Sequence, residues 1–369
     1  MERLLDRLAV DPALAERLDA ADDADFARRA AAEVDLGESE ADAALRDPAL
    51  RSARLPGATP PPGWLPVGLD TKGDEPVVEW AWFGRKRLLE PFYDESVALR
   101  LHRPINRLPR PRSPLSALVG EPMETKLTGL VFHMSRCGST LTAQMLAAPS
   151  AHAVVAEGPP IDAVVRMEGL APEAHAALLR AIVAAFGRRR TEAERRLFLK
   201  LDSWHVPALP LFRRAFPDTP WVFLHRDPVE VLVSHAHRPG LHMIADLVTP
   251  QTWGLEADGQ TFGDDYRARV LGAACRAALE GHARGGGLVV GYPSLPGAVL
   301  DHILPHFGVE IGPEERAVMV AAGGRDAKAV HAAFVPDAAA KQRAASQGLR
   351  AACARHADEP HRALAAVSV

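Results

Sequence analysis

The chain has 369 residues, of which 47% are hydrophobic, so it can bury a sizeable core in one large domain with an extension or in two domains. Its formal net charge of −4 excludes a general electrostatic attraction to nucleic acid or to anionic membranes. No stretch approaches the roughly 18 apolar residues of a membrane helix, and no apolar signal core follows Met1, so we expect a protein of the reducing cytoplasm with neither a nucleic-acid nor a membrane partner.

Residues 1–120 are predicted to form an N-terminal extension that is helical at first and Pro-rich later. Leucines recur at helical spacing through its first 18 residues, and Asp11-Pro12 marks a break and a new helix start. Residues 56–66 are rich in proline and glycine, which indicates a linker or turn cluster. Residues 77–92 alternate in part and carry four aromatic side chains, which predicts a small strand pair or an aromatic anchor. The extension could cover an acceptor site or mediate homo-oligomerisation.

The most basic part of the extension is residues 100–112, with the sequence RLHRPINRLPRPR. Its arginines could attract an anionic ligand or RNA. For this basic and Pro-rich stretch we favour the simpler interpretation, a solvated connector.

Residues 121–369 are predicted to form a three-layer α/β domain with a central parallel sheet and a helical C-terminal region. Short apolar strands alternate there with helical patterns, which is typical of parallel sheets covered by helices on both faces. The expected strands span 129–134, 153–156, 197–201, 221–225 and 287–292. The expected helices span 139–148, two segments within 160–187, 206–216, 228–236, 264–284 and 295–306.

Several polar segments directly follow the expected strands. They are residues 135–138, Glu157, residues 200–203 and Arg226. Because ligands of open parallel sheets bind at the carboxyl ends of the strands, we expect these segments to converge on one crevice.

The segment 130–141, LVFHMSRCGSTL, predicts a strand that turns sharply into a helix. Backbone N–H groups at the helix start, together with the helix dipole, form an anion site. Gly138 lets the backbone approach an anion closely, and Arg136 adds a planar charged fork suited to oxyanions. The residue after Gly138 is Ser139 rather than the Lys of a Walker A loop, which disfavours an ATP-and-metal site. The structural alternative is an ordinary strand–turn–helix junction capped by Ser139 or Thr140.

Cys137 lies in this turn, far in the sequence from Cys275 and Cys353, so the three cysteines show neither a disulfide framework nor metal-ligand spacing. A helix N-terminus and the neighbouring Arg136 could lower the pKa of its thiol. We favour the simpler interpretation that a small residue fits the turn.

A further anion site is predicted at 221–234, WVFLHRDPVEVLVS. Arg226 ends a strand, Asp227 sits at an N-cap position and Pro228 suits the first helical position. Ser234 then lies about two turns into the helix. Two anion sites beside one sheet suggest a ligand with two separated phosphate-like groups. Four histidines flank Arg226, at 225, 235, 237 and 242, but no carboxylate or Cys completes a recognisable ligand set, so no metal site is predicted.

These segments resemble the sulfotransferases that use 3′-phosphoadenosine-5′-phosphosulfate as sulfuryl donor. Segment 130–141 is similar to the family's 5′-phosphosulfate loop, R-x-G-[ST]-[ST]. Segment 221–234 is similar to its 3′-phosphate motif, an Arg-x-Pro turn with a Ser eight positions after the Arg. A weaker match lies in 289–295, VVGYPSL, which resembles a family strand that ends in a Tyr-x-x-Leu turn. The similarity covers residues 125–310 of the chain.

The resemblance implies transfer of a sulfuryl group from that donor, as a co-substrate, to a hydroxyl or amine of a small-molecule acceptor, without an obligate metal. Arg136 would assist catalysis as well as binding. The residues implied at the 5′ side of the donor are Arg136, Cys137, Gly138, Ser139 and Thr140. Those implied at the 3′ side are Arg226, Ser234 and Tyr292.

For the general base, the resemblance favours Glu157, which follows the expected strand 153–156 where several family members place a catalytic Glu. Lys200 matches the family's strand-end Lys and would assist the bridging or leaving oxygen. Asp202 occupies the usual position of a catalytic His, and His205 is displaced, so both remain alternatives. Glu157 could instead be a surface carboxylate that caps the helix near Pro159.

Two other classes of function remain open: a nucleotide-dependent kinase of the P-loop class, and a non-catalytic domain that keeps the fold as a binding module. The missing Walker Lys argues against the kinase. Basic residues near the C-terminus, Lys328, Lys341 and Arg343, are weaker candidates for closing over the 3′-phosphate and adenine.

Overall fold

The computed structural model describes residues 2–34, 37–52, 54–56, 59–237, 239–256, 261–325 and 337–369. The chain divides into two units: residues 1–127 with 157–197, and residues 128–156 with 198–369. The predicted boundary near residue 120 stays a prediction, because such a division does not show that either part folds independently. Among the described helices, none is both long and apolar enough to cross a membrane.

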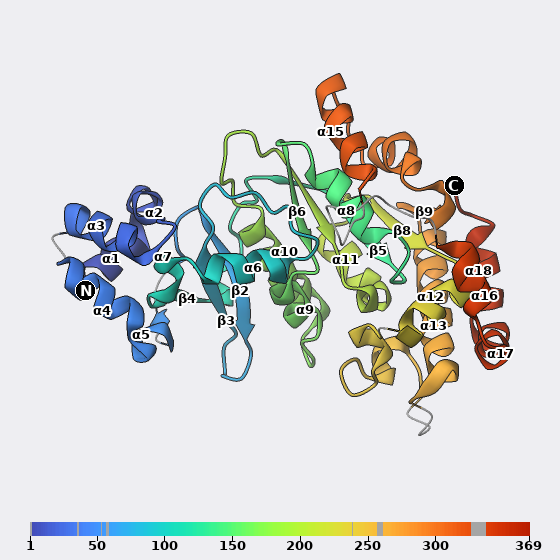
Figure 1. Cartoon of the computed structure of the whole chain (residues 1–369). Helices are drawn as coiled ribbons and strands as arrows, with labels where there is room; N and C mark the ends of the chain where they lie inside the picture. The colour runs from blue at the N-terminus through green and yellow to red at the C-terminus, as the bar shows by residue number, and fades with distance from the viewer. Residues whose placement is uncertain are drawn as a thin grey trace. The chain divides into compact units, whose positions relative to one another are not determined.

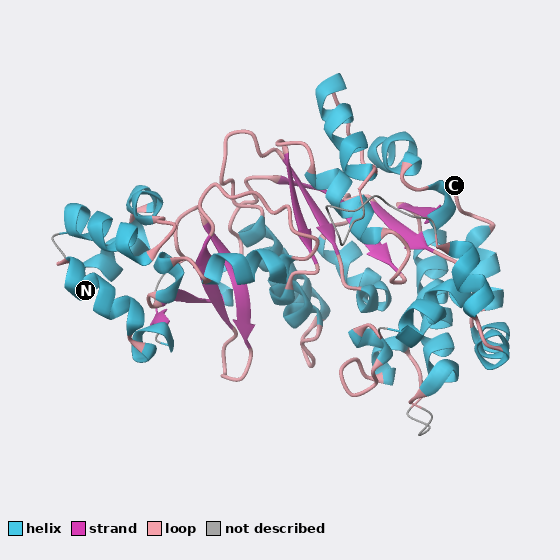
Figure 2. Cartoon of the chain, in the orientation of Figure 1, coloured by secondary structure: helices cyan, strands magenta, loops and turns pink. Residues whose placement is uncertain are grey.

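The unit of residues 128–156 and 198–369 is built on a five-stranded parallel sheet with the order β6-β7-β5-β8-β9. The strands are β5 (Lys126–His133), β6 (His152–Ala156), β7 (Arg196–Lys200), β8 (Trp221–His225) and β9 (Gly287–Gly291). β8 lies between β5 and β9, with Phe223 paired to Phe132 on one side and to Val289 on the other (Figure 1). Helices flank the sheet (Figure 2), and the predicted α/β architecture is confirmed.

The helices of this unit follow the predicted ranges except where prolines interrupt them. The predicted helix 206–216 is a 3-10 turn followed by a short α-helix, because Pro207 lacks the N–H that a continuous helix needs. The predicted helix 295–306 is a π-helical turn that leads into one α-helical turn containing Pro305. The elements are α8 (Ser139–Ala147), η2 (Ser203–Ala208), α11 (Leu209–Ala215), α12 (Pro228–His237), η3 (Leu241–Met243), η4 (Pro250–Trp253), α13 (Gly263–Ala283), η5 (Tyr292–Ser294), η6 (Val299–Ile303), α14 (Leu304–His306), α15 (Pro313–Gly323), α16 (Ala338–Ala344), α17 (Gln347–His356) and α18 (Asp358–Ala365).

The unit of residues 1–127 and 157–197 combines helices with a four-stranded mixed sheet of order β1-β4-β3-β2. Its N-terminal region is helical as predicted, and Asp11 caps α2 by accepting a hydrogen bond from the Leu14 N–H at 3.1 Å. The segment 77–92 supplies one strand, β3, and its antiparallel partner β2 begins at Trp64, inside the predicted linker. The elements are α1 (Glu2–Val10), α2 (Pro12–Leu18), α3 (Asp23–Val34), α4 (Glu38–Arg46), α5 (Pro48–Ser52), β1 (Arg54–Pro56), β2 (Trp64–Asp70), β3 (Val77–Trp82), α6 (Tyr93–Leu101), α7 (Pro104–Arg107), β4 (Arg110–Pro114), η1 (Leu115–Leu118), α9 (Pro159–Val165) and α10 (Pro172–Phe186).

Aromatic side chains build the core of this unit. Trp80 is fully buried and donates from Nε1 to Ser113 Oγ at 2.8 Å. Tyr93 packs edge-on against Phe186, with 5.2 Å between the ring centres, and its hydroxyl donates to the Pro66 carbonyl at 2.9 Å. The segment 157–197 therefore shares a core with the N-terminal residues, although residues 128–156 of the other unit separate the two in the sequence.

The basic segment 100–112 is not the solvated connector that we predicted. Arg100 and Arg103 both bind the Asp19 carboxylate, at 2.7 and 3.1 Å, and Arg112 binds Asp70 at 2.7 Å. The segment forms the end of α6, α7 and the start of β4. Its charges are balanced by acidic residues of the same unit, which lie too far away in the sequence for any local pattern to reveal the pairing.

Helix α13 packs very closely against α17, and Gly272 lies at the contact. A Cβ atom at Gly272 would be 2.0 Å from the His356 carbonyl oxygen. A backbone atom cannot move aside as the end of a flexible side chain can, so the position requires glycine. Gly348 of α17 is different, because the nearest atom to its Cβ position is the Ser346 hydroxyl at 3.9 Å.

We expect Gly272→Ala to lower the free energy of unfolding by about 1–3 kcal/mol, because overpacking outweighs the gain in helix propensity. The matched control, Gly348→Ala, should raise it by up to about 1 kcal/mol, because alanine favours a helix where space is open. Urea unfolding followed by circular dichroism measures both variants. A stabilised Gly272→Ala variant would show that the two helices are not in such close contact.

Candidate functional site

The loop between β5 and α8, residues 134–138, has the backbone conformation of an anion-binding turn. Three of its residues have positive φ angles, 71° at Ser135, 51° at Arg136 and 85° at Gly138. Left-handed residues in a strand-to-helix turn direct backbone N–H groups into a concave site that suits an anion. Keeping Ser135 and Arg136 in this conformation costs about 1–3 kcal/mol each, which is typical of functional loops. His133 fixes the start of the turn, since its Nδ1 accepts the Ser135 N–H at 3.0 Å.

The N-cap of α8 is Gly138, and not Ser139 or Thr140 as the structural alternative required. Glycine has no side chain that could accept hydrogen bonds from the first turn. Ser139 and Thr140 are the first two helical residues, and both are largely buried. The first turn therefore lies beside the concave loop without a side-chain cap on its N–H groups.

Cys137 is fully buried within the loop. Burial raises the pKa of its thiol to about 12, and loop N–H groups and the charge of Lys200 oppose this only in part. The alternative prediction, a lowered pKa for the Cys137 thiol, is therefore wrong. The interpretation that we favoured, a small residue that fits the turn, agrees with the structure. Lys200 ends β7 with 2% of its surface exposed, and the next residue, Leu201, donates its N–H to the Val131 carbonyl of β5 at 3.0 Å, so Lys200 lies beside the strand that leads into the loop.

Arg226 directly follows β8 and is almost completely buried. Its Nε donates to Glu230 Oε2 at 2.6 Å, and its Nη2 donates to Asp337 Oδ1 at 2.6 Å. Burial lowers the pKa of Arg226, but the hydrogen bonds to the two carboxylates outweigh it and raise the pKa overall, so the charge is permanent. Nη1 lies 3.5 Å from the Arg136 carbonyl oxygen, which connects this cation to the loop after β5.

Tyr292 brings the third motif to the same place. It begins η5 directly after β9, and the guanidinium of Arg226 lies 4.0 Å from its ring centre. A Cβ atom at Gly138 would lie 3.2 Å from the Tyr292 ring and 2.6 Å from Leu295 Cδ1, so this turn covers the loop glycine closely. The predicted convergence of the loop and Arg226 is confirmed, and we call the loop, Arg226 and Tyr292 the anion site. Their roles in binding stay predictions.

The start of α12 is as predicted from the sequence. Asp227 Oδ1 accepts hydrogen bonds from the N–H groups of Val229 at 2.8 Å and Glu230 at 3.2 Å, and Pro228 is the first helical residue. The Ser234 hydroxyl donates to the Glu230 carbonyl at 3.0 Å within the helix. A role for Ser234 toward a phosphate stays a prediction.

Glu157 is the first residue after β6 and belongs to the unit that includes the N-terminal residues. Its φ is 56°, a left-handed conformation that costs energy for a residue with a side chain and that clusters at functional positions. In the same unit, burial and then the charge of Glu157 raise the pKa of Asp94. The backbone conformation supports a functional position, and the role of Glu157 as a base stays a prediction.

The alternative bases Asp202 and His205 lie after β7, where η2 begins. Both are buried, and His205 Nε2 is 3.8 Å from Asp202 Oδ2. The His205 ring also packs against Phe212, with 6.0 Å between the ring centres. This is the environment of a core side chain, and a catalytic role for either residue stays a prediction.

Sequence reasoning missed both carboxylates that hold Arg226. Glu230 lies four residues later on α12, and this helical spacing was a usable signal. Asp337 is 111 positions away, and no local pattern connects it to Arg226. Lys341, a weaker candidate, binds the other oxygen of Asp337 at 2.7 Å. Lys328 lies outside the described residues.

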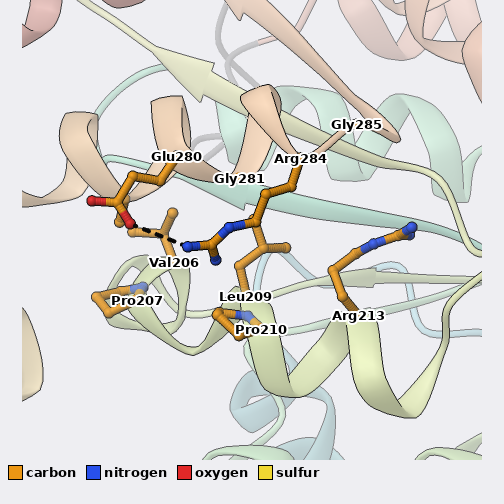
Figure 3. Close-up of a pocket in the computed structure, with 10 residues that line it drawn as sticks. Val206, Pro207, Leu209, Pro210, Arg213, Glu280, Gly281, Arg284 and Gly285 are labelled. Atoms are coloured by element: carbon orange, nitrogen blue, oxygen red, sulfur yellow. Dashed lines mark ion pairs between the residues drawn. The ribbon is translucent and has the colours of Figure 1, made fainter.

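A pocket of about 350 Å³ lies between α13 and the η2–α11 segment (Figure 3). Gly285, which precedes β9, lines it, and so does Arg213, which donates to the carbonyl of Thr219 just before β8. The pocket is therefore near the amino ends of the strands, whereas the anion site follows their carboxyl ends. Its Glu280 and Arg284 side chains pair with each other at 3.8 Å, and none of its lining residues belongs to the anion site.

No protein-family model matches the sequence, and no curated protein matches it. Among solved structures, the sulfotransferase domain of the Synechococcus PCC 7002 olefin synthase matches 60% of this chain and 85% of its own, with 18% identity and a TM-score of 0.37. A Mycobacterium avium sulfotransferase matches 56% and 69%, with 12% identity and a TM-score of 0.38. A Mycobacterium tuberculosis sulfotransferase matches 56% and 75%, with 18% identity and a TM-score of 0.33. Likenesses this low do not bear on activity.

His225, the last residue of β8, is buried and lies at the centre of a partly buried hydrogen-bonded chain. Its Nδ1 is 3.0 Å from His361 Nε2, and its Nε2 is 3.0 Å from Ser368 Oγ. Ser368 in turn pairs with Val289 of β9 as an isolated parallel bridge. Burial and then the neighbouring His361 lower the pKa of His225 from 6.5 to about 4. Protonation of this chain therefore opposes the packing of the C-terminal residues on the sheet.

We expect the contribution of His225 to the free energy of unfolding to be complete above pH 6.5 and to fall as the pH drops from 6.5 toward about 4, because only the unfolded state binds a proton at His225 in that range. The loss from this group is about 3 kcal/mol. Thermal unfolding at pH 7.5 and at pH 5 should show a smaller difference for His225→Gln than for the wild type. The exposed His237→Gln control should keep the full difference, and an equal pH response in all three proteins would contradict this assignment.

Proposed function

We propose that this protein is a sulfotransferase that moves a sulfuryl group from 3′-phosphoadenosine-5′-phosphosulfate to a hydroxyl or amine of a small-molecule acceptor. The position of Tyr292 carries the proposal, because its ring contacts the Arg226 guanidinium and its turn covers Gly138. Three separate sequence matches to one family thus meet in space. A parallel sheet brings the three segments to one edge, and the contacts of Tyr292 with Arg226 and Gly138 go beyond that general placement.

The proposed reaction forms a bond between the acceptor oxygen or nitrogen and the sulfur of the donor. It breaks the bond between that sulfur and the bridging oxygen of the 5′-phosphate, which leaves with the electron pair. The acceptor proton passes to a general base. Since no group is oxidised or reduced, catalysis depends on aligning the two reactants and on stabilising the charge that develops on the leaving phosphate.

The loop after β5 supports binding of the 5′-phosphosulfate. Its left-handed residues, together with the first turn of α8 behind the glycine N-cap, supply backbone N–H donors for anionic oxygens. Arg136 adds a charge from the loop itself. Lys200 lies close to the loop, where its charge would stabilise the leaving oxygen in the transition state.

Arg226 supports binding of the 3′-phosphate, the group that distinguishes this donor from ATP. Its guanidinium is permanently charged and held in place by Glu230 and Tyr292, so little freedom is lost when an oxyanion binds. Ser234 of α12 would add a hydroxyl donor once it turns from its helical carbonyl partner. The absence of a Walker Lys after Gly138 fits a donor of this kind better than ATP.

Glu157 is the proposed general base. It directly follows β6, and its backbone has a strained left-handed conformation. A carboxylate can take the proton from the acceptor as the bond to sulfur forms.

The proposed location is the reducing cytoplasm. The three cysteines are unpaired and buried, which fits that location.

We expect Arg226→Lys to weaken the binding of adenosine 3′,5′-bisphosphate, the desulfated donor, by about 10- to 100-fold, because lysine keeps the charge but loses the planar fork. Titration calorimetry measures the affinity. Arg213→Lys, which changes an arginine at the amino ends of the strands, is the matched control and should bind as the wild type does. Equal affinity in the two variants would remove Arg226 from the site, and tighter binding of ATP than of the bisphosphate would favour a kinase.

We expect Glu157→Gln to lower the yield of sulfated products by about 100-fold or more, because the amide cannot accept the proton. Its affinity for the bisphosphate should not change. Mass spectrometry of a cell extract supplied with the donor measures the products and also identifies the acceptor. Glu168→Gln, an exposed carboxylate after α9, is the control. Retained turnover in Glu157→Gln would exclude Glu157 as the base, and a wild type that binds the donor but sulfates nothing would favour a non-catalytic binding domain.

A further inference from the structure

The Asp337 carboxylate bridges the cations of two elements at the anion site. One oxygen accepts a hydrogen bond from Arg226 Nη2 at 2.6 Å, and the other lies 2.7 Å from Lys341 Nζ on α16. Two oxygens of one acidic group that contact a guanidinium and an ammonium are the contacts that a bound phosphate would make. Burial raises the pKa of Asp337, but the bonds to Arg226 and Lys341 lower it overall, so the carboxylate is charged at neutral pH.

Asp337 is the exchangeable member of this cluster. Its side chain is 46% exposed, whereas that of Arg226 is 4% exposed and that of Glu230 11%. Each carboxylate has a second partner, Lys341 for Asp337 and Gln342 Nε2 at 3.4 Å for Glu230, so exposure is what distinguishes them. An anion that reaches Arg226 from solvent therefore displaces Asp337 more easily than Glu230.

The charges of the cluster explain why a phosphate would replace Asp337 rather than bind beside it. Arg226 and Lys341 contribute two positive charges, and Glu230 and Asp337 contribute two negative charges, so the closed cluster is neutral. A phosphate added to the closed cluster would meet both carboxylates without a net attraction. When Asp337 leaves, one positive charge remains to attract the phosphate.

After displacement, the Asp337 side chain could bind the first-turn N–H groups of α16. It occupies the N-cap position of α16, and aspartate is among the preferred N-cap residues. In the described structure its side chain makes no capping hydrogen bond, because it turns to Arg226 instead. Turning back toward its own helix would satisfy the carboxylate with first-turn N–H groups after a phosphate has taken its place.

We infer that Asp337 is a built-in competitor of the donor: its carboxylate holds the phosphate position on Arg226 and Lys341 in the free protein, and the 3′-phosphate must displace it to bind. This inference rests on the proposed function, in which Arg226 receives the 3′-phosphate. The competitor keeps a buried cation paired when no donor is present and lowers the affinity for every anion that reaches Arg226. Asp337 therefore favours ligands that carry two anionic groups. The loop after β5 holds one group, so the ligand stays bound while its other group displaces Asp337.

Titration calorimetry of the full-length wild type and Asp337→Asn tests the inference, with adenosine 3′,5′-bisphosphate and adenosine 5′-monophosphate as ligands. Asparagine keeps the shape but removes the charge, so the bisphosphate should bind about 3- to 10-fold more tightly to the variant. The monophosphate lacks the 3′-phosphate, and its affinity should be equal for both proteins. Glu359→Gln, an exposed carboxylate on α18, controls for the change in net charge and should behave as the wild type.

The outcomes separate the two proposals. Suppose that the wild type binds the bisphosphate and Asp337→Asn binds it equally or more weakly. This result overturns the inference that Asp337 competes with the 3′-phosphate, and it leaves the proposed function standing. A gain of the same size for both ligands, or for Glu359→Gln as well, also overturns it, because the effect would then be one of general charge. If neither protein binds the bisphosphate, the proposed function fails and the competitor with it. Thermal unfolding of each variant shows that a weaker affinity does not come from loss of the fold.

Discussion

A parallel sheet brings the carboxyl ends of all its strands to one edge, and the anion site depends on that constraint. β5, β8 and β9 are neighbours, and their registers pair His133 with Leu224 and His225 with Gly291. The three strands therefore end level to within one residue. The segments that follow them meet for this reason, although long stretches of helix separate them in the sequence. The close cover of Gly138 by the turn after β9 is a consequence of the same registers.

Another constraint is the cost of a buried charge. An arginine as enclosed as Arg226 is stable only if carboxylates pair with it, and the structure supplies two of different kinds. Glu230 lies on α12, which begins two residues after Arg226, and is buried, so it positions the guanidinium. Asp337 comes from a distant segment and is half-exposed, so it can exchange with a ligand. A cation that must be both rigid and available thus has one permanent and one replaceable counter-charge.

Most of the α/β unit could be predicted from the sequence because its signals are local. The apolar run of β8, the Asp227-Pro228 helix start and the left-handed Gly138 can each be recognised within a few residues. Tertiary pairs could not be predicted in this way. The ion pair of Arg226 with Asp337 and the pairing of the basic segment 100–112 with Asp19 join residues far apart in the chain. The pKa of Cys137 is raised rather than lowered because burial, which depends on the whole fold, outweighs the backbone N–H groups and the charge of Lys200.

The path of the chain between β6 and β7 has a consequence for the history of this protein. These strands are neighbours in the sheet, yet the segment that connects them, residues 157–197, shares its core with residues 1–127, as the packing of Tyr93 against Phe186 illustrates. A chain that began near residue 120 would uncover the apolar face of α10. Relatives that lack the N-terminal residues should carry a more polar α10. Relatives that keep them should show paired changes in residues 1–127 and 157–197 where these pack together.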